Sequence, residues 1–345
     1  MTREQLTTAF NELKGIELEN LPITRSAKLM GAICIHSHLQ QVARAPDENP
    51  YPRLIACMQH VKGLLLELGN LHTLIDPPAS DSGGEPNRVE RLIDLYENAW
   101  TVYSLDTYEH SVKLIIDRLL ANGFDANYLK GKRCFDGGCG TGRFAIAMAQ
   151  LGAEVSIGLD MGERSLEFAR EMAKRLKVAN AEFINGDVTD LTRWPDQYFD
   201  FVVSNGVLHH TIEQHRGLRE HLRVTKKGGV FWLYLYGKGG IFWEIYDWVK
   251  AWLADIPPAE IRSFLLQLGL REGAVYSVLD MLAPIRTYYS REDVTEVLAG
   301  VAKFKVSILK GVADYDSMEL FLSRKYGADI FGPQGEIRLR IDRES

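Results

Sequence analysis

The chain has 345 residues, of which 46% are hydrophobic and 25% are charged, the composition of a globular protein with an ample core. The formal net charge of −6 argues against a nucleic-acid partner, because phosphate recognition usually requires a basic surface. The first ten residues lack the apolar core of a secretory signal, and no apolar run is long enough to span a bilayer. We therefore expect a cytoplasmic protein with no membrane partner.

Three apolar patterns with helical spacing open the chain, over residues 2–18, 27–42 and 51–75. Their apolar faces require partners, which could be one another, the rest of the chain or a second copy in a homodimer. Proline, glycine and serine then dominate residues 77–88, which predicts a linker. We therefore expect an N-terminal helical domain over residues 1–76, which either closes over a site and serves assembly or docks a macromolecule.

Residues 89–345 are expected to form the second domain, in which two helical patterns over residues 89–120 precede short strands that alternate with helices. The expected strands span residues 132–135, 153–159, 181–185, 199–206 and 228–237. This alternation predicts an α/β fold with a parallel sheet that is covered by helices on both faces. Ligands of such sheets bind at the carboxyl ends of the strands.

The pattern changes after the fifth strand. Residues 241–285 predict a helical insertion rich in aromatic side chains, which we expect to act as a lid that selects the acceptor and excludes water. A helix over residues 291–298 follows, and then two alternating strands over residues 303–309 and 336–341. A short helix near residues 318–324 is expected between these strands.

A glycine-rich turn follows the first expected strand, with Gly138, Gly140 and Gly142 at alternate positions and Asp136 two residues before them. Glycine allows backbone conformations closed to other residues and lets a ligand approach closely. The N–H groups at the start of the next helix are then expected to be free to face that ligand. A dinucleotide fingerprint would place its third glycine where this chain has Arg143, which disfavours a nicotinamide cofactor.

The string Asp-x-Gly-x-Gly-x-Gly from Asp136, with acidic residues Asp160 and Asp187 at the next two strand ends, resembles motifs of the class I S-adenosylmethionine-dependent methyltransferases. The resemblance covers residues 90–240 well and residues 285–341 loosely. It implies a seven-stranded Rossmann-like sheet closed by an antiparallel hairpin, and it implies S-adenosylmethionine as the cofactor.

The residues that this resemblance assigns to the cofactor lie in the glycine turn and at the following strand ends. The turn and Asn205 would approach the methionine part. Asp160 would hold the ribose, and Asp187 with Val188 would contact the adenine. The full set is Asp136, Gly138, Gly140, Gly142, Asp160, Met161, Asp187, Val188 and Asn205.

His209 and His210 follow the fourth strand and are the candidates for a catalytic base, because a neutral imidazole can accept a proton near pH 7. The alternative is that they orient the loop, since related methyltransferases of many specificities show a similar run. The candidate substrate contacts are Tyr236, Arg286, Tyr288 and Tyr289. Of the aromatic residues before the glycine turn, we expect at least one near the cofactor and the rest in the core: Tyr96, Trp100, Tyr103 and Tyr108.

Four cysteines, Cys34, Cys57, Cys134 and Cys139, form no Cys-x-x-Cys pair. Their spacing therefore predicts neither a zinc site nor a disulfide framework. No metal-ligand pattern accompanies the glycine turn either, so we expect metal-independent chemistry.

These observations predict an S-adenosylmethionine-dependent methyltransferase that moves a methyl group to an O, N or C atom of a small-molecule acceptor, with secondary metabolism as one setting. Two alternatives stay open. The acceptor could be a macromolecule, RNA or protein, docked on the N-terminal helices. The chain could also bind the cofactor without catalysing a reaction, although each acidic residue that the resemblance requires is present.

Overall fold

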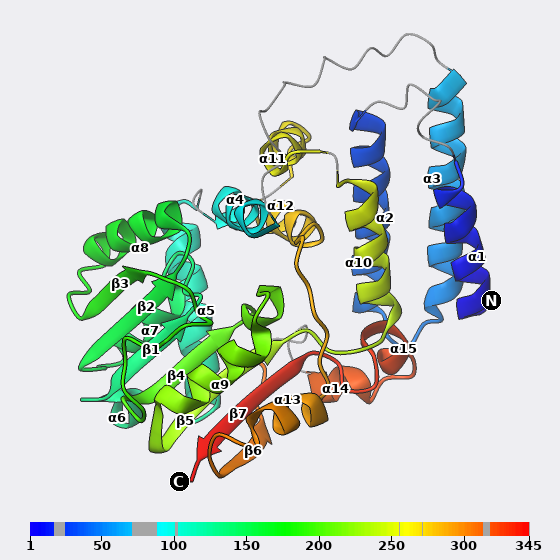
Figure 1. The fold of residues 1–345 in the computed structure, drawn as a ribbon. Coiled ribbons are helices and arrows are strands. Elements are labelled where there is room, and N and C mark those ends of the chain that lie inside the picture. The colour runs from blue at the N-terminus through cyan, green and yellow to red at the C-terminus, as the bar shows by residue number, and fades with distance from the viewer. Residues whose placement is uncertain are drawn as a thin grey trace. The chain divides into compact units, whose positions relative to one another are not determined.

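The computed structural model describes residues 1–16, 25–70, 88–100, 103–254, 256–270, 272–312 and 318–344 (Figure 1). The predicted linker lies outside these residues, except for Arg88. The chain divides into two compact units. The sheet unit comprises residues 88–238, 283–320 and 334–345, and the helical unit comprises residues 1–87, 239–282 and 321–333.

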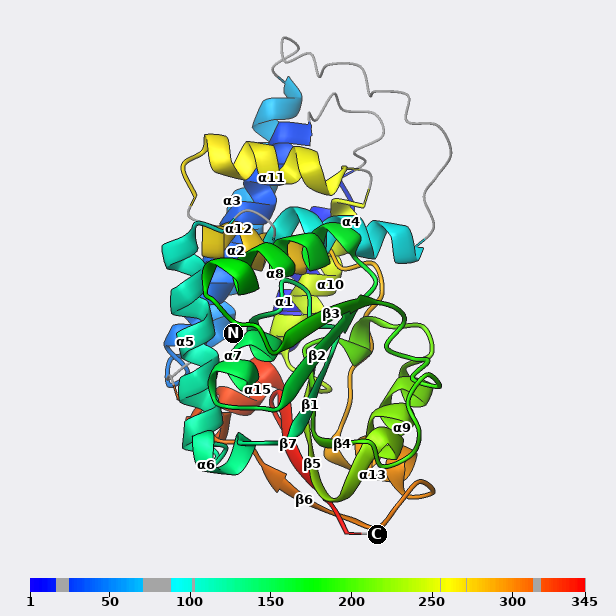
Figure 2. The same ribbon diagram turned by 90° about the vertical axis from the view of Figure 1, so that its left-hand side faces the viewer.

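A single mixed sheet of seven strands forms the centre of the sheet unit (Figure 2). Its strands are β1 (Arg133–Gly137), β2 (Val155–Asp160), β3 (Ala181–Asn185), β4 (Phe199–Asn205), β5 (Thr225–Leu235), β6 (Phe304–Ile308) and β7 (Ile337–Arg343). The spatial order is β3-β2-β1-β4-β5-β7-β6, in which β1 to β5 pair in parallel and β7 is antiparallel to both of its neighbours. This topology confirms the expected α/β class and the Rossmann-like seven-stranded sheet.

Helices cover both faces of this sheet because successive strand residues point to opposite sides. On β1, Cys134 packs into a core with helices α5 and α7, whereas its neighbour Phe135 packs into a second core with α9 and α13. The helices of the unit are α4 (Arg88–Trp100), α5 (Leu105–Ala121), α6 (Ala126–Leu129), α7 (Arg143–Gln150), α8 (Glu163–Arg175), η1 (Leu208–His210), α9 (Gln214–Val224) and α13 (Arg291–Leu298).

The start of β5 is the clearest difference between the expected and observed strands. We expected it at Gly228, after a helix that runs to Lys227, but the helix ends at Val224 and the strand begins at Thr225. Thr225 pairs with Phe199, and the register then shifts before Phe201. Gly228 has a φ of 74°, so the strand passes through a local irregularity that glycine makes accessible.

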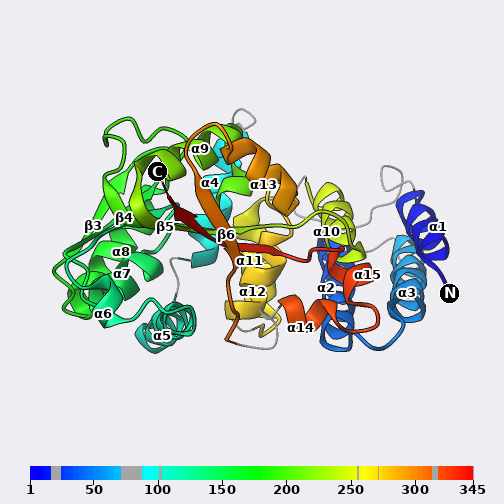
Figure 3. The ribbon, with the colours of Figure 1, turned by 90° about the horizontal axis from the view of Figure 1, so that it is seen from below.

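The helical unit joins the N-terminal helices to the insertion. It contains α1 (Arg3–Lys14), α2 (Arg25–Arg44), α3 (Pro50–Asn70), α10 (Ile241–Trp252), α11 (Pro258–Gln267), α12 (Glu272–Asp280) and α15 (Gly327–Phe331), while α14 (Met318–Leu322) lies at a boundary between the units. The ring of Phe10 stacks on Trp248, with centroids 3.6 Å apart. Figure 3 shows α10 beside α2, where a Cβ on Gly31 would come within 2.6 Å of Trp252.

We expected the chain to divide at residue 76, with the insertion in the second domain. In the structure, the insertion belongs to the same compact unit as the N-terminal helices. The physical reason is the aromatic face of α10, which α1 and α2 cover. The role of the insertion as a lid stays a prediction. Among the helices of the described residues, none is long and apolar enough to cross a membrane.

Deletion of residues 1–70 should therefore cause aggregation, because it uncovers the apolar and aromatic side chains of α10, Trp248 and Trp252 among them. Size-exclusion chromatography with light scattering measures the outcome. A monodisperse truncated chain that unfolds at the wild-type temperature would contradict the observed packing.

Candidate active site

The glycine turn between β1 and α7 adopts the left-handed conformation that its sequence predicts. Gly138, Gly140 and Gly142 have φ angles of 79°, 50° and 80°. A Cβ on Gly142 would come within 2.4 Å of the Phe183 ring, so packing as well as φ requires glycine there. A Cβ on Gly140 would meet no atom within 4 Å, so this glycine borders open space that a ligand can fill.

The amides of the turn are engaged with the neighbouring strand. The N–H groups of Gly138 and Cys139 both donate to the Leu159 carbonyl, over 2.8 and 3.0 Å. The N–H of Gly140 donates to Oδ2 of Asp160 over 2.8 Å. The expectation that free amides face the ligand concerned the start of α7 at Arg143, and it stays a prediction, whereas these three amides of the turn are engaged. Because they are already satisfied within the protein, they cannot receive a phosphate.

Three carboxyl groups gather around the turn and the end of β2. Asp136 is buried and accepts the N–H of Ala145, and burial raises the pKa of its carboxyl to about 7. Asp160 also accepts the N–H of Gly162 over 2.9 Å, and burial raises its pKa as well. The third, Glu97, is buried on α4 and faces the same Gly162. This arrangement favours a cationic ligand and disfavours an anionic one.

The sequence did not indicate Glu97 as a site residue. It belongs to no motif, and its only signal is an acidic position on an amphipathic helix. In the structure it accepts the N–H of Arg164 over 2.9 Å and so caps the start of α8. Its proximity to Asp160 contributes to the raised pKa of that carboxyl.

The raised pKa of Asp136 predicts a pH dependence of stability. An unfolded aspartate has a pKa of about 3.9, so the folded chain favours the protonated carboxyl. That stabilisation is complete below about pH 4 and is lost as the pH rises through about 7. Without added ligand, the melting temperature of wild type relative to Asp136→Asn should therefore fall across this window. A constant difference over the same pH series would contradict the raised pKa.

The loop after β3 holds the two residues assigned to adenine. Oδ1 of Asp187 accepts both the N–H and the hydroxyl of Thr189, over 2.7 and 2.8 Å, which fixes the turn. The Val188 side chain is buried in the core that Phe135 and α9 share. Its backbone belongs to the loop. The adenine assignment stays a prediction for both residues.

Asn205 and Met161 lie at the ends of β4 and β2. Oδ1 of Asn205 accepts the indole N–H of Trp232 over 3.2 Å, which fixes the orientation of the amide. Met161 is 41% exposed, and its carbonyl accepts the side-chain amide of Asn185. Both residues therefore lie beside the carboxyl ends of the central strands, as their assignment to the cofactor requires.

His210 is held by two hydrogen bonds. Its Nδ1 lies 2.7 Å from the Ile285 carbonyl, which can only accept, so Nδ1 carries the proton. In the neutral ring, Nε2 is then the acceptor, and the Tyr96 hydroxyl donates to it over 2.9 Å. His210 is therefore the hydrogen-bond acceptor in a Tyr96–His210 pair, and its role as a catalytic base stays a prediction.

His209 has a different environment. Its ring is fully buried, neither ring nitrogen has a hydrogen-bond partner among the described residues, and it stacks on Tyr236 with centroids 3.9 Å apart. Burial, followed by the nearby His210 and Arg286, lowers the pKa of His209 well below its usual value. We infer that His209 is a neutral packing residue, whereas the two histidines could not be distinguished in the sequence.

The return segment, residues 284–289, runs beside these histidines. The N–H of Tyr289 donates to the Tyr236 carbonyl, and the Arg286 guanidinium lies 5.7 Å from the Tyr236 ring centre. The Tyr289 ring is buried in the core with Val294, so the geometry does not support its predicted contact with a substrate. Tyr288 precedes Tyr289, which forms an isolated parallel bridge with Gly237, and the contact of Tyr288 with a substrate stays a prediction.

Helix α4 connects the two halves of the site. Two consecutive residues of α4 contact different loops: Tyr96 bonds to the loop after β4, and Glu97 bonds to the segment after β2. Figure 2 shows this helix beside α8. From α5, the Tyr108 hydroxyl donates to the Thr141 carbonyl of the glycine turn over 2.6 Å. Two of the four aromatic candidates thus contact site loops, while the Trp100 side chain lies outside the described structure.

The sheet order and the turn define a Rossmann-like α/β domain built to bind a cofactor at its carboxyl edge. A family model described as a methyltransferase domain matches residues 129–253. The ubiquinone biosynthesis O-methyltransferase of Neisseria meningitidis is 30% identical over 171 residues, which cover 44% of this chain and 70% of that protein. The chain therefore belongs to the class I S-adenosylmethionine-dependent methyltransferases.

Other relatives match a shorter part of the chain. The demethylmenaquinone methyltransferase of Geobacillus kaustophilus is 37% identical over 106 residues, 30% of this chain and 45% of that protein. The chain thus spans less than half the length of the demethylmenaquinone methyltransferases that it matches. Among solved structures, an S-adenosylmethionine-dependent methyltransferase from Thermotoga maritima is 19% identical, with a TM-score of 0.42, over 74% of this chain and 100% of that one.

Proposed function

We propose that this protein transfers the methyl group of S-adenosylmethionine to a small-molecule acceptor with an aromatic ring. The observation that carries the proposal is the group of carboxyls around the glycine turn and the end of β2, of which Asp160 bonds to the N–H of Gly140. When bound, the cofactor supplies an electrophilic methyl group on a positively charged sulfur. Asp136, Asp160 and Glu97 surround the open space at Gly140 and the end of β2. Burial raises the pKa of Asp136 and Asp160 in the ligand-free protein, and a cation bound beside them would favour their ionised forms.

The same arrangement argues against a dinucleotide. A pyrophosphate needs donors, but the amides of Gly138, Cys139 and Gly140 donate to Leu159 and Asp160. The carboxyls would in addition repel its negative charge. The wide match to methyltransferases agrees with this choice of cofactor.

The acceptor is proposed to bind near Tyr236. The Tyr236 ring is buried against His209, and the Arg286 guanidinium lies 5.7 Å from its centre, so aromatic and cationic side chains meet beside the histidines. Together with Tyr288 they would form the wall that a planar aromatic acceptor contacts. The relatives are named for ubiquinone and demethylmenaquinone methylation, and their names point to the same chemical class.

Tyr96 and His210 provide a route for the acceptor proton. A phenolic acceptor that donates to the Tyr96 oxygen can pass its proton to Tyr96, while the Tyr96 proton moves to Nε2 of His210. The deprotonated acceptor oxygen would then be the nucleophile for the methyl group that the bound cofactor would supply, with the neutral thioether as leaving group. His210 ends as an imidazolium, and the Ile285 carbonyl holds its Nδ1–H throughout.

Substitution of His210 by Gln or of Tyr96 by Phe should each lower kcat by about 10²–10⁴-fold, the usual contribution of general-base catalysis. His215→Gln is the matched control, because His215 is an exposed histidine on α9. Steady-state kinetics with a methylated phenol as product measures the effect. Wild-type kcat in both variants would remove the pair from the mechanism.

Labelled methyl transfer tests the proposed function itself. The protein is incubated with methyl-labelled S-adenosylmethionine and with separate small-molecule, RNA and protein fractions of a bacterial extract. We expect label in the small-molecule fraction, in compounds that include phenols and quinols. Label in the RNA or protein fraction alone would identify a macromolecular acceptor instead, and label in no fraction would favour a protein that binds the cofactor without transfer.

A further inference from the structure

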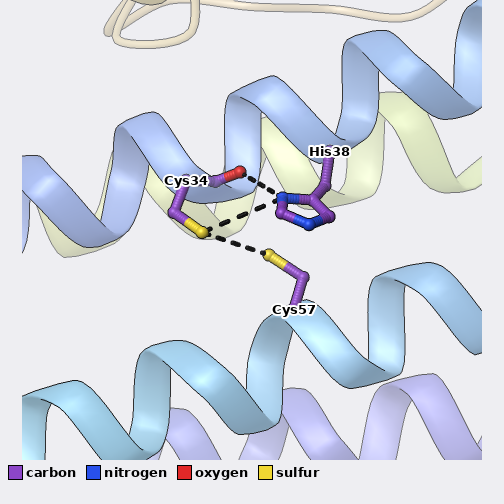
Figure 4. A group of neighbouring side chains, drawn as sticks. All are labelled: Cys34, His38 and Cys57. Atoms are coloured by element: carbon purple, nitrogen blue, oxygen red, sulfur yellow. Dashed lines mark hydrogen bonds between the residues drawn. The ribbon is translucent and has the colours of Figure 1, made fainter.

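Outside the methyl-transfer site, one group of side chains in the helical unit has the composition and spacing of a metal site. Cys34 and His38 lie four residues apart on α2, and Cys57 faces them from α3 (Figure 4). Residues four apart on a helix lie on the same face, so α2 presents its thiol and imidazole together. Their three ligand atoms lie within 4.8 Å of one another.

The distances between these atoms match a tetrahedral ion. The two sulfurs are 3.9 Å apart, and Sγ of Cys34 is 3.8 Å from Nδ1 of His38. Tetrahedral zinc with Zn–S of about 2.3 Å and Zn–N of about 2.0–2.1 Å separates two sulfurs by about 3.8 Å, and sulfur from nitrogen by about 3.6 Å. Two of the three separations are therefore already within a few tenths of an ångström of those around a zinc ion, and the third, between Cys57 and His38, is below 4.8 Å.

We propose that Cys34, His38 and Cys57 bind one Zn²⁺ ion, with the fourth position open to water. Two thiolates and an imidazole are the soft and borderline ligands that zinc prefers among divalent ions. The open position follows from exposure, since Cys34 and His38 are half-buried and only Cys57 is buried. The site would join α2 to α3, so zinc should stabilise the helical unit.

The metal-free state has hydrogen bonds that zinc would replace. Nδ1 of His38 lies 2.9 Å from the Cys34 carbonyl and therefore donates its proton to it. Binding through Nδ1 moves that proton to Nε2 and exchanges the hydrogen bond for a Zn–N bond. The two thiols lose their protons to water as the Zn–S bonds form. Burial raises the pKa of the Cys57 thiol, so in the metal-free chain this group is a neutral thiol.

The proposal departs from the sequence-based expectation of no zinc site. That expectation rested on the absence of Cys-x-x-Cys pairs, whereas these ligands come from two helices whose cysteines are 23 residues apart. It leaves the expectation of metal-independent methyl transfer unchanged, because the three residues belong to the helical unit.

Metal binding by the full chain tests the proposal. The purified protein is stripped with a chelator, dialysed against Zn²⁺, and assayed for bound metal by mass spectrometry. We expect one equivalent of zinc and, with Co²⁺ as the probe, a thiolate-to-cobalt charge-transfer absorption. Removal of a second-sphere group typically costs about 10–100-fold in metal affinity, and removal of a direct ligand costs more. Cys34→Ser, Cys57→Ser and His38→Gln should therefore each weaken zinc binding by at least about 100-fold.

Two variants serve as matched controls. His60→Ala removes an exposed histidine from α3, and Cys134→Ser removes a buried thiol from the sheet unit, so both should keep wild-type zinc binding. Since Cys34 is half-buried, the Cys34→Ser variant should stay folded, and its circular dichroism spectrum checks this. Zinc binding that is absent in wild type, or equal in the ligand variants, would overturn the proposal. A Cys34–Cys57 disulfide after peroxide treatment of a chain that binds no zinc would replace the metal site with a thiol pair.

Discussion

Gly142→Ala is expected to destabilise the protein severely, whereas Gly140→Ala is expected to leave it folded and weaken cofactor binding. Both positions have positive φ, which costs a non-glycine residue about 1–2 kcal/mol. Only at Gly142 would the new Cβ also collide with Phe183 and Ala169, at 2.4 and 2.9 Å. Overpacking adds about 1–3 kcal/mol, for a total of about 2–5 kcal/mol.

At Gly140 the added methyl group meets no protein atom and instead enters the space assigned to the cofactor. If the steric overlap costs about 1–3 kcal/mol of binding free energy, S-adenosylmethionine should bind about 5- to 150-fold more weakly. Gly131→Ala is the matched control, because Gly131 also has a positive φ and open surroundings but lies before β1. Denaturant titration and calorimetry separate the two effects. Wild-type affinity in Gly140→Ala would show that the cofactor does not lie against this turn.

Asp160→Ala should have the second large effect, a loss of about 30- to 1,000-fold in affinity for S-adenosylmethionine. The carboxylate holds the N–H groups of Gly140 and Gly162, and we assign its remaining lone pairs to the ribose hydroxyls. Loss of charge-assisted hydrogen bonds at this position corresponds to about 2–4 kcal/mol of binding free energy. The thermal stability should change much less, because burial already raises the pKa of this carboxyl.

Asp190→Ala provides the comparison for this variant. Asp190 also fixes a turn, by accepting the N–H and hydroxyl of Thr192, but it is exposed and carries no assigned cofactor contact. Isothermal calorimetry on both variants should show weak binding for Asp160→Ala alone. Equal affinities in the two variants and the wild type would remove Asp160 from the cofactor site.

The sequence predicted the sheet because its signals are local. Alternating apolar residues, glycine turns and strand-end acids each depend on neighbours in the chain, and β3 was predicted at its observed bounds, residues 181–185. The start of β5 was misplaced because residues 225–227 were assigned to the preceding helix, whereas they belong to a strand that is irregular at Gly228. The short helix α15 was missed because its five residues carry no periodic pattern.

The site shows the same limit. Glycine spacing predicted the shape of the turn, but the partners of its amides depend on how β1 pairs with β2. The sequence could not distinguish His209 from His210, because only the fold places Tyr96 and Ile285 beside one of them. Glu97 and the cluster of Cys34, His38 and Cys57 were not predicted for the same reason. Their contacts join different helices and loops, which only the fold brings together.

Calorimetric titration with S-adenosylmethionine, its demethylated product and NAD tests the central claim most directly. The carboxyls beside Gly140 and the engaged amides of the turn predict micromolar binding of the first two ligands and no detectable binding of NAD. Binding of NAD with comparable affinity, or no binding of S-adenosylmethionine to the folded chain, would contradict the assignment of this site.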